Sequence, residues 1–121
     1  MDTRRISPNE LEVMQAWLAH DVADAAVLRT QLTAETEVYR SCSCGCGSIG
    51  FVNIDESLDP GVSIFDVDAE IVDENGATVG GMTLLIRNGR LHDVDVHTWL
   101  DPLPFPTVEE VRWHPRTGRD D

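Results

Sequence analysis

The sequence predicts a single α+β domain in which N-terminal helical segments pack on one face of an antiparallel sheet. Apolar residues recur at helical spacing up to about residue 32, and from Thr33 onward they alternate with a period of two. Two Asn-Gly pairs, Asn75-Gly76 and Asn88-Gly89, each separate two alternating segments, which is a strong signal for a β-hairpin. A chain of 121 residues is long enough to bury one hydrophobic core. We therefore expect one domain, with helices at about 8–32, a sheet at about 34–99 and a C-terminal strap and tail at 100–121.

The first helix is predicted to begin at Ser7. Ser7 is a good N-cap, Pro8 fits the first turn, and Glu10 stands three residues on as the partner in a capping box. Apolar residues then follow at helical spacing, with a further helical stretch opening at Asp21. No glycine or proline divides the two stretches, so they are either separate helices or one bent helix.

The alternating part predicts a meander of four or five strands at about 34–41, 48–54, 62–72, 77–87 and 90–99. A two-residue loop at Asn75-Gly76 would place eight residues on one core face, in the pairs Ile71–Gly80, Ala69–Met82, Val67–Leu84 and Phe65–Ile86. The second hairpin keeps Val94 and Val96 on that face only if one extra residue is inserted at His92-Asp93. We therefore predict a β-bulge there.

The C-terminal part is predicted to lie outside the sheet. The run from Asp101 to Pro106 contains three prolines, which cannot donate to a central strand, so it is expected to form an extended strap with Leu103 and Phe105 tucked against the body. Thr107 with Glu110 predicts the cap of a last short helix through Trp113. Residues 114–121 are expected to be a frayed tail.

The predicted register leaves a polar face on the side of the sheet away from the helices. Its expected members are Asp66, Asp68, Glu70, Thr83, Leu85, Asp95, His97 and Trp99. Carboxylates beside an imidazole favour contact with a basic partner, with the tryptophan as an aromatic anchor, and they are also the groups of a divalent-ion site or an acid-base pair. Alternating polar residues on a half-exposed sheet are also expected without any function.

The charge of the chain is strongly negative. Twenty-two acidic residues face nine basic ones, which gives a net charge of -13. Direct binding to nucleic acid is not expected, because phosphate contacts need clustered Lys or Arg. A negative field would attract a basic partner or a metal ion, although it would also simply keep a small protein soluble. Neither a signal peptide nor an apolar run long enough to span a membrane is recognised, so a cytoplasmic location is expected.

All three cysteines, Cys42, Cys44 and Cys46, stand two apart and alternate with small residues. Three interpretations are open: a tight connection lined by small side chains, a metal-ligand cluster, or a thiol redox device. Zinc would need a fourth ligand, for which His97 or His92 is available. The usual zinc pattern is two Cys-x2-Cys pairs, and this spacing departs from it.

Two segments resemble a group of short bacterial proteins. One runs from Arg40 to Phe51 and carries the cysteines into a strand, and the other runs from Leu84 to Val96 and turns through Asn-Gly into an acid-bearing strand. The resemblance covers about 38–110 and extends to the proline-rich strap. It implies a shared fold, with a Cys-x-Cys-Gly-Cys element followed by an antiparallel sheet, and brings no known activity. The members are small, free-standing and acidic, which fits an accessory or immunity-type protein.

The function expected from the sequence is that of a non-enzymatic protein-binding module, of the inhibitor or immunity type. It would present Asp66, Asp68, Glu70, Asp95, His97 and Trp99 to a basic protein. The alternative is a small zinc protein whose structural site is made by Cys42, Cys44 and Cys46 together with His97. A hydrolase or isomerase using Asp95 and His97 is the third and least favoured interpretation. The sequence argues against it, because no nucleophile has a base at recognisable spacing. The sequence makes no prediction of the oligomeric state.

Overall fold

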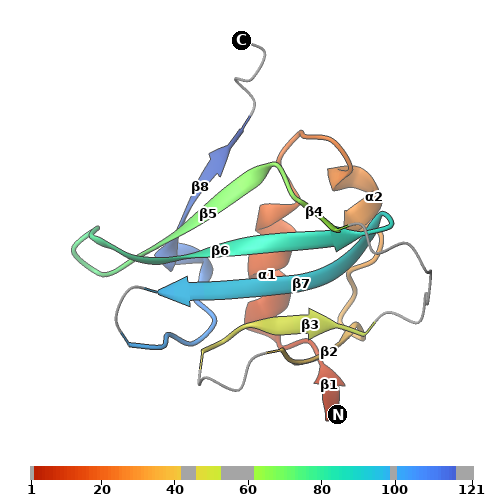
Figure 1. The fold of residues 1–121 in the computed structure, drawn as a ribbon, viewed down its shortest axis with the longest axis horizontal. Helices are drawn as coiled ribbons and strands as arrows, with labels where there is room; N and C mark the ends of the chain where they lie inside the picture. The colour runs from red at the N-terminus through yellow and green to blue at the C-terminus, as the bar shows by residue number, and fades with distance from the viewer. Residues whose placement is uncertain (1, 42–45, 53–61, 99–100, 117–121) are drawn as a thin grey trace.

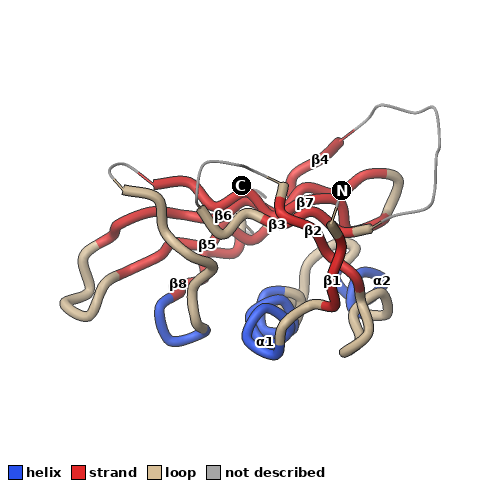
Figure 2. The backbone as a smooth tube through the Cα atoms, turned by 90° about the horizontal axis from the view of Figure 1, so that it is seen from below, coloured by secondary structure: helices blue, strands red, loops and turns tan. Residues whose placement is uncertain are grey.

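The computed structural model describes residues 2–41, 46–52, 62–98 and 101–116. Within these residues the strands form one eight-stranded antiparallel sheet in the order β1-β2-β3-β7-β6-β5-β8, with β4 paired to β6 off this path (Figure 1). Both helices lie on the same side of the sheet (Figure 2). The elements are β1 (Thr3–Arg5), α1 (Pro8–Trp17), α2 (Ala25–Arg29), β2 (Glu37–Arg40), β3 (Ile49–Phe51), β4 (Val62–Ile64), β5 (Val67–Val72), β6 (Thr78–Arg87), β7 (Arg90–Thr98), the 3-10 turn η1 (Val108–Glu110) and β8 (Val111–Pro115).

The predicted α+β class and antiparallel sheet are confirmed, but the simple meander is not. The edge strands β1 and β8 add to the predicted set, and β3 pairs with β7 rather than with the strand that follows it in the chain. Within the described part of the chain, no helix has the length and apolar character needed to cross a membrane.

Helix α1 begins at the predicted capping box. The backbone N–H of Glu10 donates to Ser7 Oγ at 3.0 Å, and the N–H of Ser7 donates to Glu10 Oε1 at 2.9 Å. The Glu10 carboxylate also accepts two hydrogen bonds from the Arg4 guanidinium, at 2.8 and 2.7 Å. Burial raises the pKa of Glu10, but the bonds from Arg4 and Ser7 outweigh it, so the pKa lies below its usual value. This carboxylate therefore ties the start of the helix to the edge strand β1.

The second helical stretch is shorter than predicted and separate from the first. Asp24 has a positive φ of 71°, and α2 spans only Ala25–Arg29 after it. A left-handed residue cannot continue a helix, so the break needs neither glycine nor proline. The Arg29 side chain then donates to the carbonyl of Leu18 at 2.6 Å and holds α2 against the end of the first helix.

The first hairpin has the predicted register at Ala69 and Ile71, but the predicted two-residue loop is wrong, because Val72 lies opposite Thr78 and the N–H of Asp73 donates to the carbonyl of Ala77. Ala69 lies opposite Met82 and Ile71 opposite Gly80, and all eight residues predicted for the core face are buried. The turn itself is organised by Asp73, whose Oδ1 accepts the N–H groups of Asn75 and Ala77 at 2.9 Å each. An irregularity between Ile71 and Val72 accompanies this turn.

Farther from the turn, the predicted strand 62–72 is divided into β4 and β5. Ser63 lies opposite Ile86, where the uniform register placed Phe65. The chain is therefore offset by two residues at the junction between the two strands. Phe65 remains in the core at 2% exposure, and its N–H donates to the carbonyl of Leu84 at 3.0 Å.

The predicted β-bulge is present in the second hairpin. Leu85 lies opposite Asp93 and Ile86 opposite Leu91, so His92 is the extra residue of β7. Beyond it Val94 pairs with Leu84 and faces the core. The bulge places Asp93 and Asp95 on the other face of the sheet.

The predicted C-terminal helix is wrong. Thr107 and Glu110 do form a capping box, but only one 3-10 turn follows, and residues 111–115 form strand β8 along β5. Five residue pairs with the open edge of β5 outweigh a local helix signal. The predicted tail therefore begins in a strand at His114, and residues 117–121 lie outside the described part of the chain.

The core lies between α1 and the helix side of the sheet. Trp17 is completely buried, and its Nε1 donates to the carbonyl of Val67 at 2.8 Å. The Trp113 ring on β8 lies 5.5 Å from that of Trp17, centroid to centroid. The strap packs as predicted, with Leu103 and Phe105 half-buried against the core.

Candidate binding surface on the outer face

The helices leave one face of the sheet uncovered, which we call the outer face (Figure 2). The strand register brings residues from five strands into a single row across it. The row consists of Tyr39, Gly50, Asp93, Leu85 and Ile64, on β2, β3, β7, β6 and β4. Ile64 at its end is 51% exposed. A carboxylate thus stands in the middle of a mostly apolar row.

The Asp93 carboxyl group is half-buried in this row. The Tyr39 ring lies over Gly50, where an added Cβ would be less than 3.0 Å from the ring, and half-buried Leu85 lies opposite Asp93 on the other side. Burial raises the pKa of Asp93, although a hydrogen bond from Ser41 and the nearby charge of His92 lower it in part. Its buried Oδ1 has no hydrogen-bond partner among the described residues.

Next to Asp93, the outer face carries Asp95 and His97. Asp95 is exposed and lies opposite Thr83. The His97 ring lies over Gly81, where an added Cβ would be 2.8 Å from its Cε1, and its Nε2 is 3.4 Å from Thr83 Oγ1. Asp95 and His97 therefore share one face, as the sequence predicted. Within the described chain, no arginine forms an ion pair with Asp93 or Asp95.

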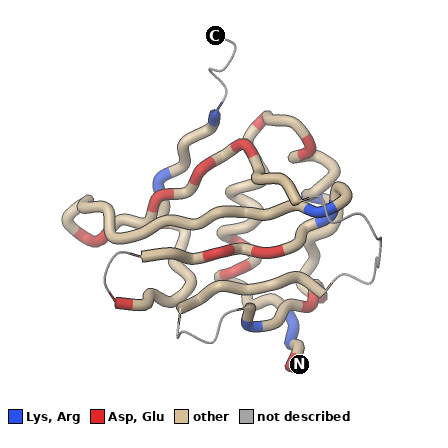
Figure 3. The backbone as a smooth tube through the Cα atoms, viewed as in Figure 1, with Lys and Arg blue, Asp and Glu red and all other residues tan. Residues whose placement is uncertain are grey.

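The carboxylates of β5 have a different environment, because β8 lies beside them. Glu70 Oε1 is 2.7 Å from His114 Nε2 and 3.5 Å from Arg112 Nη1, and Asp68 Oδ1 is 3.0 Å from Arg116 Nη2. Hydrogen bonds from Thr78 and then His114, together with the charge of Arg112, lower the pKa of Glu70. Figure 3 shows the acidic positions of β5 next to basic ones on β8. The negative charge expected along β5 is therefore largely compensated.

Asp66 marks the end of this compensated region. Its backbone carbonyl accepts the N–H of Arg116 at 2.8 Å. The remaining member of the predicted surface, Trp99, lies outside the described residues. The charge of the outer face is thus concentrated on β7 rather than on β5.

The described end of the cysteine element is fixed to the body by its neighbours. Ser48 Oγ accepts the N–H of Val96 at 2.7 Å and lies 3.2 Å from Cys46 Sγ. The N–H of Gly47 donates to the carbonyl of Leu103 at 2.8 Å, and the strap passes so close that a Cβ at Gly47 would collide with the backbone of Phe105. Gly47 and Ser48 therefore have structural roles that join β7 to the strap.

The predicted zinc ligands are only partly described. Cys42 and Cys44 lie outside the described residues. Cys46 borders a cavity with Arg4 and Glu10 on the helix side of the sheet, whereas His97 lies on the outer face. The structure does not bring these two together, and among the residues it describes no three His, Cys, Asp or Glu side chains form a group that could hold a metal ion. The zinc site stays a prediction.

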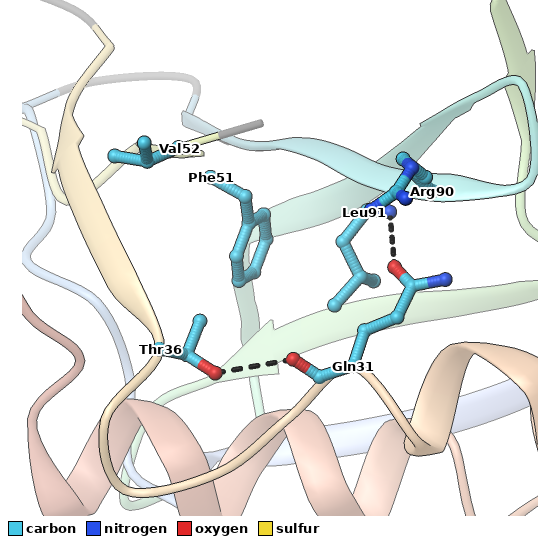
Figure 4. Close-up of a pocket in the computed structure, with 6 residues that line it drawn as sticks. All are labelled: Gln31, Thr36, Phe51, Val52, Arg90 and Leu91. Carbon is cyan, nitrogen blue, oxygen red and sulfur yellow. Dashed lines mark hydrogen bonds between the residues drawn. The ribbon is translucent and has the colours of Figure 1, made fainter. Parts of the chain in front are cut away.

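A small cavity of about 100 Å³ lies at the other end of the sheet, between the Phe51 ring and Gln31 (Figure 4). Gln31 Nε2 donates to the carbonyl of Gly89 at 2.8 Å, and its Oε1 accepts the N–H of Leu91 at 2.9 Å. Both polar groups of the Gln31 amide are thus engaged by the β6–β7 hairpin. We assign this side chain a structural role, in which it holds the hairpin to the segment after α2.

Comparison of the chain with protein-family models, with curated proteins and with solved structures finds no match. Function is therefore inferred from the geometry. Sequence reasoning did not select Asp93 or Tyr39 as site residues. The predicted bulge at His92 was the signal available for Asp93, because a residue after the bulge must turn to the outer face. The position of the Tyr39 ring depends on a glycine in the neighbouring strand.

Proposed function

We propose that the protein is a non-enzymatic binding module whose outer face receives a positively charged segment of a partner protein. The observation that carries the proposal is the pair Asp93 and Asp95, which have no basic ion-pair partner among the described residues and lie beside a row of aromatic and aliphatic side chains. Sites where charged and apolar groups adjoin are typical of protein recognition surfaces.

The chemistry of this surface fits a basic segment with aliphatic parts. A cationic group would pair with exposed Asp95 and with the accessible part of the Asp93 carboxylate, and an ion pair at a half-buried carboxylate is stronger than one in open water. The side chains of Tyr39, Leu85 and Ile64 provide apolar area beside it. The net charge of -13 would accelerate the encounter with a basic protein at low salt.

Binding is favoured over catalysis because the residues stand on an open surface. Asp95 and His97 are both exposed, and among the described residues the His97 ring has Thr83 as its hydrogen-bonding neighbour, at a long 3.4 Å. A general acid or base normally works in a site that excludes water. The exposed pair supports recognition of a partner better than an acid-base reaction.

The proposal is tested with a fluorescein-labelled octa-arginine peptide and fluorescence anisotropy. We expect D93N/D95N to weaken binding by about ten-fold or more, as the loss of charge-assisted contacts predicts. The matched control is E74Q/E109Q, which removes the same charge from exposed positions near the β5–β6 turn and η1. We expect the control to stay within about two-fold of the unmodified protein. Equal weakening by both variants would mean that the peptide senses only total charge, and the proposal would fail.

A further inference from the structure

A second candidate site lies on the helix side of the sheet, where a cavity of about 300 Å³ opens between β1, β2, the start of β3 and the strap. Its lining includes Arg4, Glu10 and Arg40 together with Ile49 and Phe105. Arg40 lies opposite Ile49 in the β2–β3 pair, so it belongs to the inner face and not to the outer one. The cavity is thus separate from the proposed protein-binding surface.

The lining of this cavity is positive, in a chain of net charge -13. Both oxygens of the Glu10 carboxylate are engaged by Arg4, and one also accepts the N–H of Ser7. Arg40 is exposed, and in the part of the chain that the structure describes no carboxylate pairs with it. Two guanidinium groups therefore face the cavity with one carboxylate, and that carboxylate is already paired.

Part of the cavity wall is apolar. Ile49 is 2% exposed, and Phe105 is half-buried against the core. The polar groups of the adjoining segment are already engaged, since the N–H of Gly47 donates to Leu103 and Ser48 Oγ accepts from Val96. Recognition of a charge in this cavity therefore depends on the guanidinium groups, and recognition of shape depends on the apolar wall.

We propose that this cavity binds a small organic anion. Its carboxylate pairs with Arg40, beside the Arg4–Glu10 ion pair, and its apolar part lies against Ile49 and Phe105. An arginine fork matches a carboxylate in geometry, and a guanidinium beside an apolar surface can hold both parts of such an anion.

The test is a titration followed by the backbone amide signals in NMR, with phenylacetate as probe, phenylacetamide as its neutral isostere and sulfate as a charge without an apolar part. We expect phenylacetate to shift the amide signals of Gly47, Ile49 and Phe105 in a saturable way. Phenylacetamide and sulfate should each bind more weakly than phenylacetate, by about ten-fold or more. Shifts confined to other residues, or no saturation at about 20 mM phenylacetate, would overturn the proposal. The proposal would also be overturned if sulfate or phenylacetamide bound with the same affinity as phenylacetate.

Two variants complete the test. R40Q should weaken phenylacetate binding by about ten-fold or more, because it removes the group that pairs with the carboxylate. R5Q removes the same charge from an exposed position on β1, where Arg5 alternates with Arg4 and lies opposite Glu37. Its affinity should stay within about two-fold. Equal losses in R40Q and R5Q would refute a specific role for Arg40, whatever the result with the octa-arginine peptide.

Discussion

Replacing Asp93 with asparagine should stabilise the protein while it weakens the binding of a basic partner. The carboxylate is half-buried on the strand between Gly50 and Leu85, and its Oδ1 lacks a hydrogen-bond partner among the described residues. A buried polar atom left without a partner costs about 1–3 kcal/mol, and more when it is charged. Because Asp93 keeps part of its contact with water, we expect a gain of about 1 kcal/mol in D93N. For a chain of this size, that gain raises Tm by about 3–5 °C.

The assay is thermal unfolding at pH 7 of the unmodified protein, D93N and D95N. D95N is the control, because Asp95 is exposed, and its free energy of unfolding should change by less than about 0.5 kcal/mol. The pH dependence gives a second check. The pKa of Asp93 is higher in the folded protein than in the unfolded chain, so ionising this group destabilises the fold. The destabilisation is complete at a pH above the folded pKa and is absent at a pH below the unfolded pKa of about 3.9.

The advantage of D93N should therefore shrink as the pH falls through the folded pKa of Asp93. His92 and Asp95 are the charged groups that act on this carboxyl, and the Ser41 bond acts with them. A D93N protein less stable than the unmodified one at pH 7 would refute the reasoning. So would an advantage that grows in acid, since the carboxylate would then have a structural role and not a binding one.

Three further predictions concern the rest of the chain. E10Q should lower the free energy of unfolding by about 1–2 kcal/mol at pH 7, as measured with urea, because it weakens the cap of α1 and the bond to half-exposed Arg4. The pKa of Glu10 is lowered in the folded protein, so the ionised carboxylate stabilises the fold above the unfolded pKa of about 4.3, and this stabilisation is lost as the pH falls through the folded pKa. If E10Q lost the same free energy of unfolding at pH 2 as at pH 7, this explanation would be contradicted. In the same assay, G47A should lower the free energy of unfolding by about 2–3 kcal/mol, because the added Cβ collides with the backbone of the strap. G50A should lower it by about 1 kcal/mol, because its Cβ meets the Tyr39 ring, which can move. Equal losses would show that the strap moves as easily as a side chain. If the three cysteines hold zinc, protein purified without chelator should contain about one equivalent of metal by elemental analysis, and metal-free protein with three reactive thiols would end that interpretation.

Local signals predicted the parts of the fold that are decided locally. The capping box at Ser7, the hairpin at Asn75-Gly76 and the bulge at His92 each depend on residues close together in the chain. The bulge was predictable because its absence would have turned Val94 and Val96 toward water. This is a constraint that alternating strands impose strongly.

The edge strands were not predictable in this way. β1 has only three residues, all exposed, and so carries no alternation to detect. The segment after Thr107 has a genuine capping box, and only the open edge of β5, about forty residues earlier in the chain, turns it into a strand. Local preference and long-range pairing disagree here, and the pairing decides.

The same long-range pairing explains what the sequence could say about the candidate site. Asp68 and Glu70 were correctly expected on the outer face as an acidic ladder, but their compensation by Arg112 and Arg116 depends on β8. Asp93 has its raised pKa because it is half-buried on β7 between neighbouring strands, with Gly50 on one side and Leu85 on the other. Charge compensation and burial across a sheet follow from which strands are neighbours, and neither is visible in the spacing along one strand.

The placement of arginines on the outermost strands has a consequence for how copies of the protein meet one another. A sheet edge exposes unpaired N–H and C=O groups that invite another strand, and such contacts lead to aggregation. Arg4 and Arg5 occupy β1, and Arg112 and Pro115 occupy β8. A strand arriving from a second copy would bring like charges together at either edge and, at β8, would meet a residue that lacks an N–H. Some of the few basic residues of this acidic chain thus lie on its edge strands, where they oppose edge-to-edge association of the sheets in concentrated solution.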